Sequence, residues 1–201
     1  MSDPKTIAWY QAQAPRHVHS SAIGPSRHLD AFLDRLTPGA RILELGCGGG
    51  RDALHMAERG FAVDATDGTP AMVRKARERT GLKVREMRFD QLRSADDYDA
   101  VWAHACLLHV RRADLPDILS RIGTALRPGG WHYASFKLAG PENPVEGRDR
   151  HGRLHNFPEP AWIEATYRKA GFRIEEALVF RGDGADGVVR DWLAVTVRKP
   201  N

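Results

Sequence analysis

A run of glycines is the stretch of this sequence with the clearest chemical meaning. Residues 42–45 are apolar except for Glu44, and glycine then occupies four of the five positions 46–50. Glycine adopts backbone angles that other residues avoid and lets a ligand approach the main chain closely. Residues 52–59 follow with apolar side chains at helical spacing. A strand, a glycine turn and a helix start with unpaired N–H groups can hold a nucleotide-like ligand.

The spacing of the glycines narrows the class of ligand. A dinucleotide site has the pattern G-x-G-x-x-G, but here the glycines read G-x-G-x-G and Arg51 stands where that motif needs its last glycine. Glu44 lies two residues before the first glycine. A carboxyl group buried in a strand is costly unless it is paired, so we expect Glu44 to organise the loop or to face a cationic ligand.

The segment 44–50 resembles motif I, E/D-x-G-x-G-x-G, of the class I S-adenosylmethionine-dependent methyltransferases, and Glu44, Gly46, Gly48 and Gly50 match it in register. The resemblance covers residues 26–198. It implies an α/β, Rossmann-like fold, in which a mostly parallel seven-stranded sheet has one antiparallel strand and helices on both faces. It also implies the cofactor S-adenosyl-L-methionine, with S-adenosyl-L-homocysteine as product. The cofactor-binding residues that it indicates are Tyr10, Glu44, Gly46, Cys47, Gly48, Arg51, Asp67, Gly68, Asp90, Gln91 and Ala103.

Two acids follow predicted strands, where ligands of open α/β sheets bind. By the resemblance, Asp67 binds the ribose hydroxyls; Asp64 is a rival by spacing, and Asp67 as a helix-capping residue is the structural alternative. Asp90 resembles the family acid that accepts the adenine amino group, with the backbone N–H of Gln91 serving the ring. A surface turn is the alternative there. Arg51, at the helix start, could clamp the carboxylate of the methionine part.

The residues that would contact a methyl acceptor follow the fourth and fifth strands. Phe136-Lys137 and the segment 147–153 resemble small bacterial methyltransferases of the methyltransferase-11 or tellurite-resistance-like type. The candidates for catalysis are His104, Lys137, Arg148, Arg153 and His155. Their basic and histidine content could bind an anion or act as a base, whereas a solvated loop is the alternative for 148–157. We expect His109 to be a packed or helix-start histidine and Cys106 a small apolar group.

Strands and helices alternate along the chain, which favours a parallel sheet covered on both faces. The pattern predicts an irregular segment 1–25, a helix 27–36 and strands 61–66, 83–89, 98–103, 131–138, 172–181 and 188–198. Further helices are expected over 70–80, 113–126 and 160–170, and a loop over 139–158. The last two strands have no helix between them, which implies one antiparallel strand. We expect one domain, 26–201, with 1–25 as an N-terminal lid.

Composition excludes several other classes of protein. The 201 residues are 42% hydrophobic with a net charge of +4, which fits one folded domain without a basic tract typical of nucleic-acid binding. The two cysteines form no C-x-x-C pair and the nine histidines are scattered, so no metal site is predicted. The sequence shows no signal peptide or membrane span. We therefore expect a cytoplasmic protein without membrane or nucleic-acid partners; the pattern indicates no oligomeric state.

The sequence thus predicts an S-adenosylmethionine-dependent methyltransferase (EC 2.1.1.-) that acts on a small molecule, with anionic acceptors among the candidates. A non-catalytic S-adenosylmethionine-binding module is one alternative, and it would bind the cofactor without turnover. An NAD-dependent oxidoreductase is the other alternative, but the third glycine of its motif is missing, because position 51 is Arg51.

Overall fold

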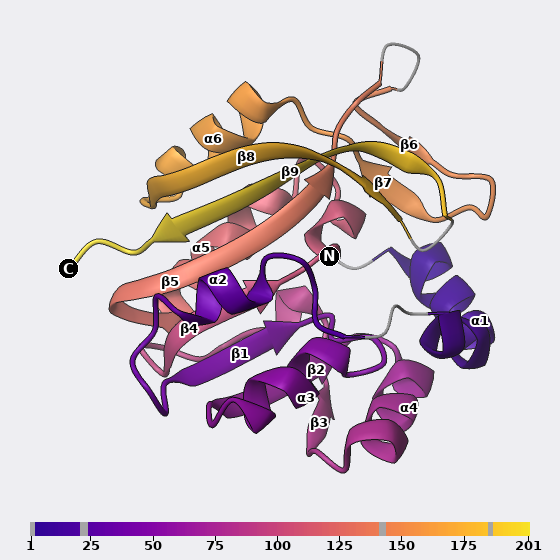
Figure 1. The fold of residues 1–201 in the computed structure, drawn as a ribbon. Helices are drawn as coiled ribbons and strands as arrows, with labels where there is room; N and C mark the ends of the chain where they lie inside the picture. Colours follow the sequence, from indigo (N-terminus) through magenta and orange to yellow (C-terminus); the bar gives the residue numbers. More distant parts are fainter. Residues whose placement is uncertain (1–2, 21–23, 141–143, 185–186) are drawn as a thin grey trace.

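The computed structural model describes residues 3–20, 24–140, 144–184 and 187–201, with the side chains of 16–20 left out. Helices and strands alternate through most of the chain (Figure 1). The helices are α1 (Pro4–Ser20), α2 (Leu29–Leu33), α3 (Arg51–Glu58), α4 (Pro70–Thr80), α5 (Leu115–Ala125) and α6 (Pro160–Lys169), with short 3-10 turns η1 (Phe89–Gln91) and η2 (Leu107–His109). The strands are β1 (Arg41–Leu45), β2 (Ala62–Asp67), β3 (Val84–Glu86), β4 (Tyr98–Ala103), β5 (Leu126–Lys137), β6 (Glu146–Arg148), β7 (Leu154–Asn156), β8 (Arg173–Asp183) and β9 (Val189–Arg198).

Seven strands form the main sheet in the order β3-β2-β1-β4-β5-β9-β8. Strand β9 runs antiparallel to both β5 and β8, and the other pairs are parallel. This confirms the predicted sheet with one antiparallel strand. From β1 the chain moves outward to β2 and β3, and then returns to β4 on the other side of β1. Such a reversal leaves a crevice at the carboxyl ends of the strands, where ligands of open α/β sheets bind.

Both faces of the sheet are covered, because successive strand residues point to opposite sides. Ile42 packs with Phe32 of α2 and Met56 of α3. Leu43, its neighbour in β1, belongs to the core cluster on the other face, which includes Ile122 of α5 and Ile163 of α6. The near-continuous apolar run of the strand is therefore buried on both sides, as the alternation of strands and helices predicts.

The N-terminal segment differs from the irregular chain expected over 1–25. Residues 4–20 form helix α1, because the Asp3 carboxylate accepts the backbone N–H of Thr6 at 2.9 Å and Pro4 stands in the first turn, where no N–H is needed. The proline inside the helix, Pro15, is tolerated because α1 packs on α4: Ala14 is buried beside Ala71 there. Residues 1–2 and 21–23 of the expected lid lie outside the described residues.

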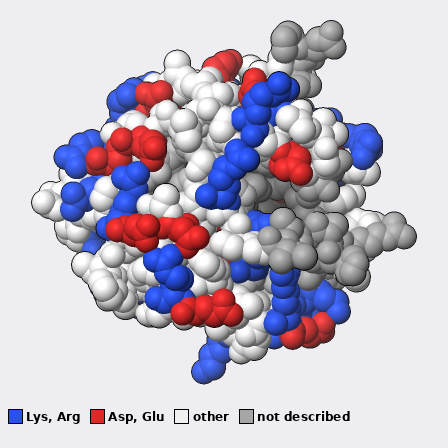
Figure 2. All heavy atoms as spheres, in the orientation of Figure 1, with Lys and Arg blue, Asp and Glu red and all other residues white. Residues whose placement is uncertain are grey.

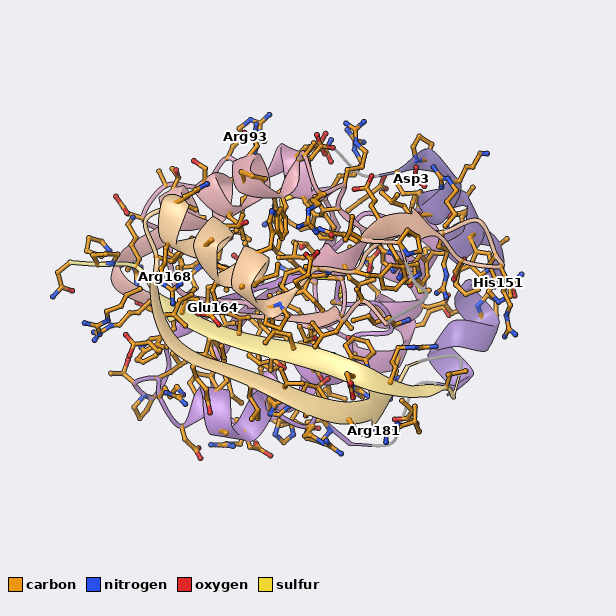
Figure 3. All side chains as sticks on the ribbon, turned by 90° about the horizontal axis from the view of Figure 1, so that it is seen from above. Asp3, Arg93, His151, Glu164, Arg168 and Arg181 are labelled. Carbon is orange, nitrogen blue, oxygen red and sulfur yellow. The ribbon has the colours of Figure 1, made fainter. Side chains whose placement is uncertain are left out.

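The expected loop 139–158 contains a second small sheet. Strands β6 and β7 pair antiparallel, with Gly147 opposite His155. Each has three residues, which is too short for an alternating pattern to be recognised. Residues 141–143 of this segment are outside the described residues. In Figure 3, His151 of this hairpin and Asp3 lie at the α1 end of the molecule, opposite Glu164 and Arg168 of α6.

Other elements differ from the prediction mainly in their ends. The helix expected over 27–36 is only five residues long, because the backbone N–H groups of Arg35 and Leu36 bond three residues back and tighten the chain into turns. The third strand stops at Glu86 and the fifth begins already at Leu126. Among the described residues, none of the helices combines the length and apolar character needed to cross a bilayer.

Candidate active site

A cavity of about 470 Å³ lies at the carboxyl ends of the central strands. Its walls come from the glycine loop after β1, the ends of β2, β4 and β5, helix α1 and the β6–β7 hairpin. Figure 1 shows α1 and this hairpin on the same side of the sheet, beyond the strand ends. The cavity therefore combines the expected nucleotide end with a second end that is built from parts distant in sequence.

Most of the residues proposed from the sequence line this cavity. Those that do are Tyr10, Glu44, Gly46, Cys47, Gly48, Arg51, Asp67, Gly68, His104, Lys137, Arg153 and His155. Asp90, Gln91, Ala103 and Arg148 do not line it in the part of the chain described. The glycine motif and the strand ends thus converge on one site, while four of the predicted residues are not part of its described wall.

Asp67 ends β2 and joins two turns of the site. One carboxylate oxygen accepts the backbone N–H of Gly48 at 3.0 Å and the other accepts that of Thr69 at 2.8 Å. Its rival Asp64 instead pairs with Arg41 at 2.7 Å and accepts the Tyr98 hydroxyl, away from the cavity. Asp67 therefore supports the turn before α4 and also lines the cavity, so the structural role does not exclude the predicted binding role.

Burial raises the pKa of Asp67 to about 6, against the opposing effect of the N–H groups of Gly48 and Thr69. In the predicted role, the carboxylate accepts hydrogen bonds from both ribose hydroxyls, and protonation turns one of its two oxygens into a donor. We expect the affinity for S-adenosylhomocysteine to fall about tenfold between about pH 7.5 and about pH 5, since a group one pH unit below its pKa is roughly one-tenth ionised. Calorimetric titrations at both pH values, with Asp67→Asn as the control that should show no such loss, measure this; a flat wild-type profile would contradict it.

Glu44 and Gly48 show features that fit a ligand with charged groups. The Glu44 carboxyl is buried, its Oε2 atom has no hydrogen-bond partner among the described residues, and burial followed by the charges of Asp52 and Asp67 raises its pKa well above the ordinary value. Gly48 has a φ of +56° and a Cβ there would meet no described atom within 4 Å. Both residues line the cavity, so it has open space at the loop and an unmatched polar atom on its wall, which a bound ligand could satisfy.

Arg51 and Asp52 are neighbours on the cavity wall, and only Arg51 was predicted from the sequence. The Arg51 guanidinium pairs with Asp52 at 3.2 Å and donates to Ser26. Asp52 also accepts the Ser26 backbone N–H at 2.9 Å and the Trp102 indole N–H at 3.0 Å. Asp52 lines the cavity although it was not predicted; an acid directly after a glycine loop, in the first turn of a helix, was the available signal.

His104 follows β4 and faces the cavity. Its ring stacks 6.0 Å from Trp102, and Nδ1 lies 3.2 Å from the Ser135 hydroxyl. Burial lowers the pKa of His104 to about 4, so the imidazole is neutral at neutral pH. It can therefore exchange hydrogen bonds with a bound molecule without adding charge.

The four remaining predicted residues are placed as follows. Asp90 lies next to Phe89, which lines the cavity, and its carboxylate is 3.4 Å from Arg88. The backbone N–H of Gln91 already donates to Arg88 within η1, so it is not free for an adenine ring in this conformation. Ala103 is fully buried. Arg148 is exposed and pairs with Asp3 at 2.8 Å, so it fastens the hairpin to the start of α1.

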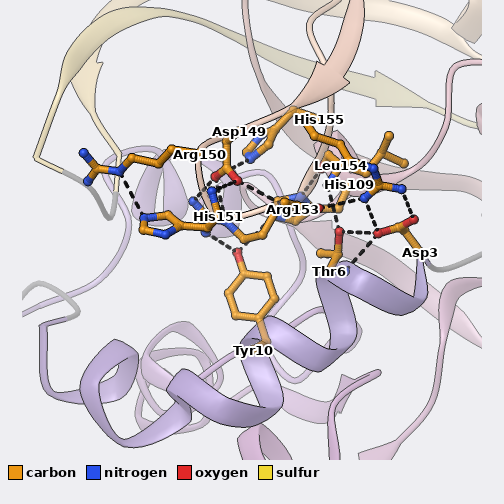
Figure 4. Close-up of polar contacts among 12 residues, drawn as sticks. Asp3, Thr6, Tyr10, His109, Asp149, Arg150, His151, Arg153, Leu154 and His155 are labelled. Atoms are coloured by element: carbon orange, nitrogen blue, oxygen red, sulfur yellow. Dashed lines mark hydrogen bonds and ion pairs between the residues drawn. The ribbon is translucent and has the colours of Figure 1, made fainter.

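A polar chain links α1 to the hairpin at the other end of the cavity (Figure 4). The His109 ring bonds the Leu154 carbonyl through Nδ1 at 2.6 Å, so Nε2 is the atom that accepts the Tyr10 hydroxyl at 2.9 Å. Arg153 donates to the same hydroxyl at 3.2 Å. His109 therefore lines the cavity with both ring nitrogens engaged, which agrees with the expected packed histidine.

Among the described residues, no group of three or more histidine, cysteine or acidic side chains is arranged to hold a metal ion. The two cysteines are free and buried. Burial raises the pKa of both thiols well above the ordinary value, which keeps them protonated and disfavours nucleophilic chemistry.

Comparison with known proteins gives three related findings. A family model described as a methyltransferase domain matches residues 42–130. A ubiquinone biosynthesis O-methyltransferase of Xanthomonas axonopodis pv. citri is 31% identical over 193 residues, covering 84% of this chain and 77% of the relative. An uncharacterized methyltransferase of Mycobacterium tuberculosis is 31% identical over 156 residues, covering 66% and 78%.

The fold is shared with a solved structure from Burkholderia thailandensis. That protein, a 1,6-didemethyltoxoflavin-N1-methyltransferase with bound 1,6-didemethyltoxoflavin and S-adenosylhomocysteine, superposes with a TM-score of 0.80. The match covers 98% of this chain and 88% of the other at 22% identity. Identity this low supports the architecture and no more.

Proposed function

The chain belongs to the class I S-adenosylmethionine-dependent methyltransferases, and on this basis we propose that its methyl acceptor is a small molecule bound in the cavity. The single observation that carries the proposal is the cavity itself. Its volume of about 470 Å³ lies within the range of small-ligand sites, and α1 and the β6–β7 hairpin contribute to its walls. The ubiquinone biosynthesis relative and the toxoflavin-related structure are consistent with an acceptor of this size.

The residues present fit the cofactor. Asp67 would hold the ribose hydroxyls, the glycine loop would lie against the nucleoside, and Glu44 and Arg51 would face the charged groups of the methionine part. When bound, S-adenosylmethionine supplies a methyl group on a positively charged sulfur. The protein's contribution is then to align the acceptor and exclude water, because transfer of this kind depends on proximity and orientation more than on acid–base groups.

The surface gives no support for a macromolecular acceptor on the face drawn in Figure 2, where basic and acidic side chains are interspersed. Nucleic acid binding would favour clustered basic side chains on one face. A cytoplasmic location stays a prediction from the sequence.

The segment 1–25 acts as a lid in this proposal. Tyr10 of α1 lines the cavity, and the helix is fastened on two sides. The Leu154 backbone N–H of the hairpin donates to Thr6 Oγ1 at 2.9 Å, and the Ala71 N–H of α4 donates to Gln11 at 3.0 Å. Release of these contacts would open the cavity without unfolding the sheet.

Two measurements test the function. Calorimetry should detect binding of S-adenosylhomocysteine and none of NAD. A screen of small acceptors with S-adenosylmethionine carrying a radiolabelled methyl group should then find transfer to at least one of them. Transfer only to protein or nucleic acid in the same screen would overturn the small-molecule proposal, and binding of NAD alone would overturn the cofactor assignment.

A further inference from the structure

The end of the cavity beyond the glycine loop carries an unusual amount of buried positive charge. We call this the acceptor end and define it by Lys137, Arg153 and His155, with Tyr10 and His109 on its wall; all five line the cavity. Lys137 is 8% exposed and Arg153 is 5% exposed. Lysine and arginine are rarely buried to this degree unless something compensates their charge.

Arg153 has a carboxylate partner at the edge of the site, and both cations lie near aromatic rings. Arg153 pairs with Asp149 at 2.7 Å, and its guanidinium also lies 4.2 Å from the centre of the Trp9 ring. The Lys137 ammonium lies 5.5 Å from the centre of the Trp192 ring. Asp149 is not among the described residues that line the cavity, whereas Lys137 and Arg153 are. The acids Asp3 and Asp183 line it as well.

The two histidines at this end both have a lowered pKa, because of burial and in part because of neighbouring positive charge. Burial, and then the charges of Lys137 and Arg153, lower the pKa of His155 to about 4. Burial and the neighbouring His155 lower that of His109 well below its usual value. Both imidazoles are therefore neutral at neutral pH, and a further positive charge is disfavoured at this end.

His155 supplies the observation that points to a ligand. It is 2% exposed, and neither ring nitrogen has a hydrogen-bond partner among the described residues. Nε2 lies 3.4 Å from Asp149, which is longer than an ordinary hydrogen bond. The centre of the His109 ring lies 4.6 Å from that of His155, and both nitrogens of His109 have hydrogen-bond partners. An unmatched buried polar group is costly, and a bound oxygen or hydroxyl would satisfy it.

The cavity wall also contains apolar side chains. Trp192, Leu108, Ile7 and Phe180 line the cavity together with the charged groups. Aromatic and aliphatic walls favour a flat, apolar body, and the cations favour a negative group attached to it.

We propose that the acceptor is a small ring compound that bears an anionic oxygen, and that this oxygen binds between Lys137, Arg153 and His155. The proposal rests on the proposed function, since it names the class of molecule that the same cavity receives. The anionic oxygen can belong to a phenolate or enolate, or to a carboxylate on the ring. All share a negative oxygen that accepts charge-assisted hydrogen bonds.

Binding of matched probes to the protein saturated with S-adenosylhomocysteine tests the proposal. Equilibrium dialysis compares 4-nitrophenol, at a pH where it is ionised, with its neutral methyl ether 4-nitroanisole. A second pair, benzoate and benzamide, separates a carboxylate from a phenolate. The wild-type protein should bind at least one anion about tenfold or more tightly than its neutral partner, the size expected of a charged hydrogen bond. Equal affinity within both pairs would overturn the proposal.

Two variants test whether Lys137 is responsible for the preference for the anionic probe. Lys137→Met should lose about tenfold in affinity for the preferred anion and bind the neutral partner as the wild type does. Arg150→Met is the matched control, because it removes the same charge from an exposed position of the hairpin that does not line the cavity. Retention of the full preference in Lys137→Met would contradict the assignment.

The readouts keep the two proposals apart. Failure of the wild-type protein to bind S-adenosylhomocysteine would count against the proposed function. Normal binding of S-adenosylhomocysteine without any preference for anions would overturn only the acceptor class. The wild-type comparison requires no variant, so the test holds even where a substitution prevents folding.

Discussion

Asp67→Ala is expected to weaken the binding of S-adenosylhomocysteine by about 1–3 kcal/mol, or roughly 5- to 150-fold. The carboxylate is 8% exposed and lines the cavity at the end of β2. Its removal leaves ribose hydroxyls without their acceptor in a site that water reaches poorly. It also frees the N–H groups of Gly48 and Thr69, so the loop loses part of its support. Calorimetry on the purified variant measures the loss.

Asp64→Ala is the control for this experiment. Asp64 lies on the same strand, but it pairs with Arg41 and Tyr98 and does not line the cavity as described. Its affinity for S-adenosylhomocysteine should match that of the wild type. Unchanged affinity in Asp67→Ala, with thermal melting showing a folded protein, would reassign Asp67 to a purely structural role in the turn before α4.

Gly46→Ala is expected to lower the free energy of unfolding by about 2–5 kcal/mol. Gly46 has a φ of +67°, and a Cβ built there would lie 2.6 Å from the Cβ of Cys106 and 3.1 Å from its sulfur. A left-handed conformation costs an alanine about 1–2 kcal/mol, and forcing an extra methyl group into a packed region costs about 1–3 kcal/mol more. Urea denaturation followed by circular dichroism measures the change.

Gly48→Ala separates these two contributions. Gly48 also has a positive φ, of +56°, but a Cβ there would meet no described atom within 4 Å. Only the conformational cost of about 1–2 kcal/mol should appear in its unfolding free energy, while the new methyl group would project into the ligand space. Equal losses of stability in the two variants would show that Cys106 moves aside at no cost.

The glycine motif and the order of elements could be read from the sequence because both depend on neighbours in the chain. The spacing of Gly46, Gly48 and Gly50 reflects the backbone angles of one turn, and all three have positive φ in the structure. The apolar runs predicted the central strands, since β1 and β4 are buried along almost their whole length. The resemblance to a known family supplied the strand order and the choice of Asp67 over Asp64.

The sequence proposed Lys137, Arg153 and His155 as candidates, but the contacts that build the acceptor end were decided by tertiary structure. Tyr10 meets His109 across 99 positions and Arg153 across 143, and no local pattern encodes such pairings. Likewise, Asp52 became a wall of the cavity only through Ser26 and Trp102, 26 and 50 positions away. Local residue types therefore predicted a nucleoside site after the first strand. Which distant side chains complete the cavity depended on how α1 and the β6–β7 hairpin pack over the ends of the strands.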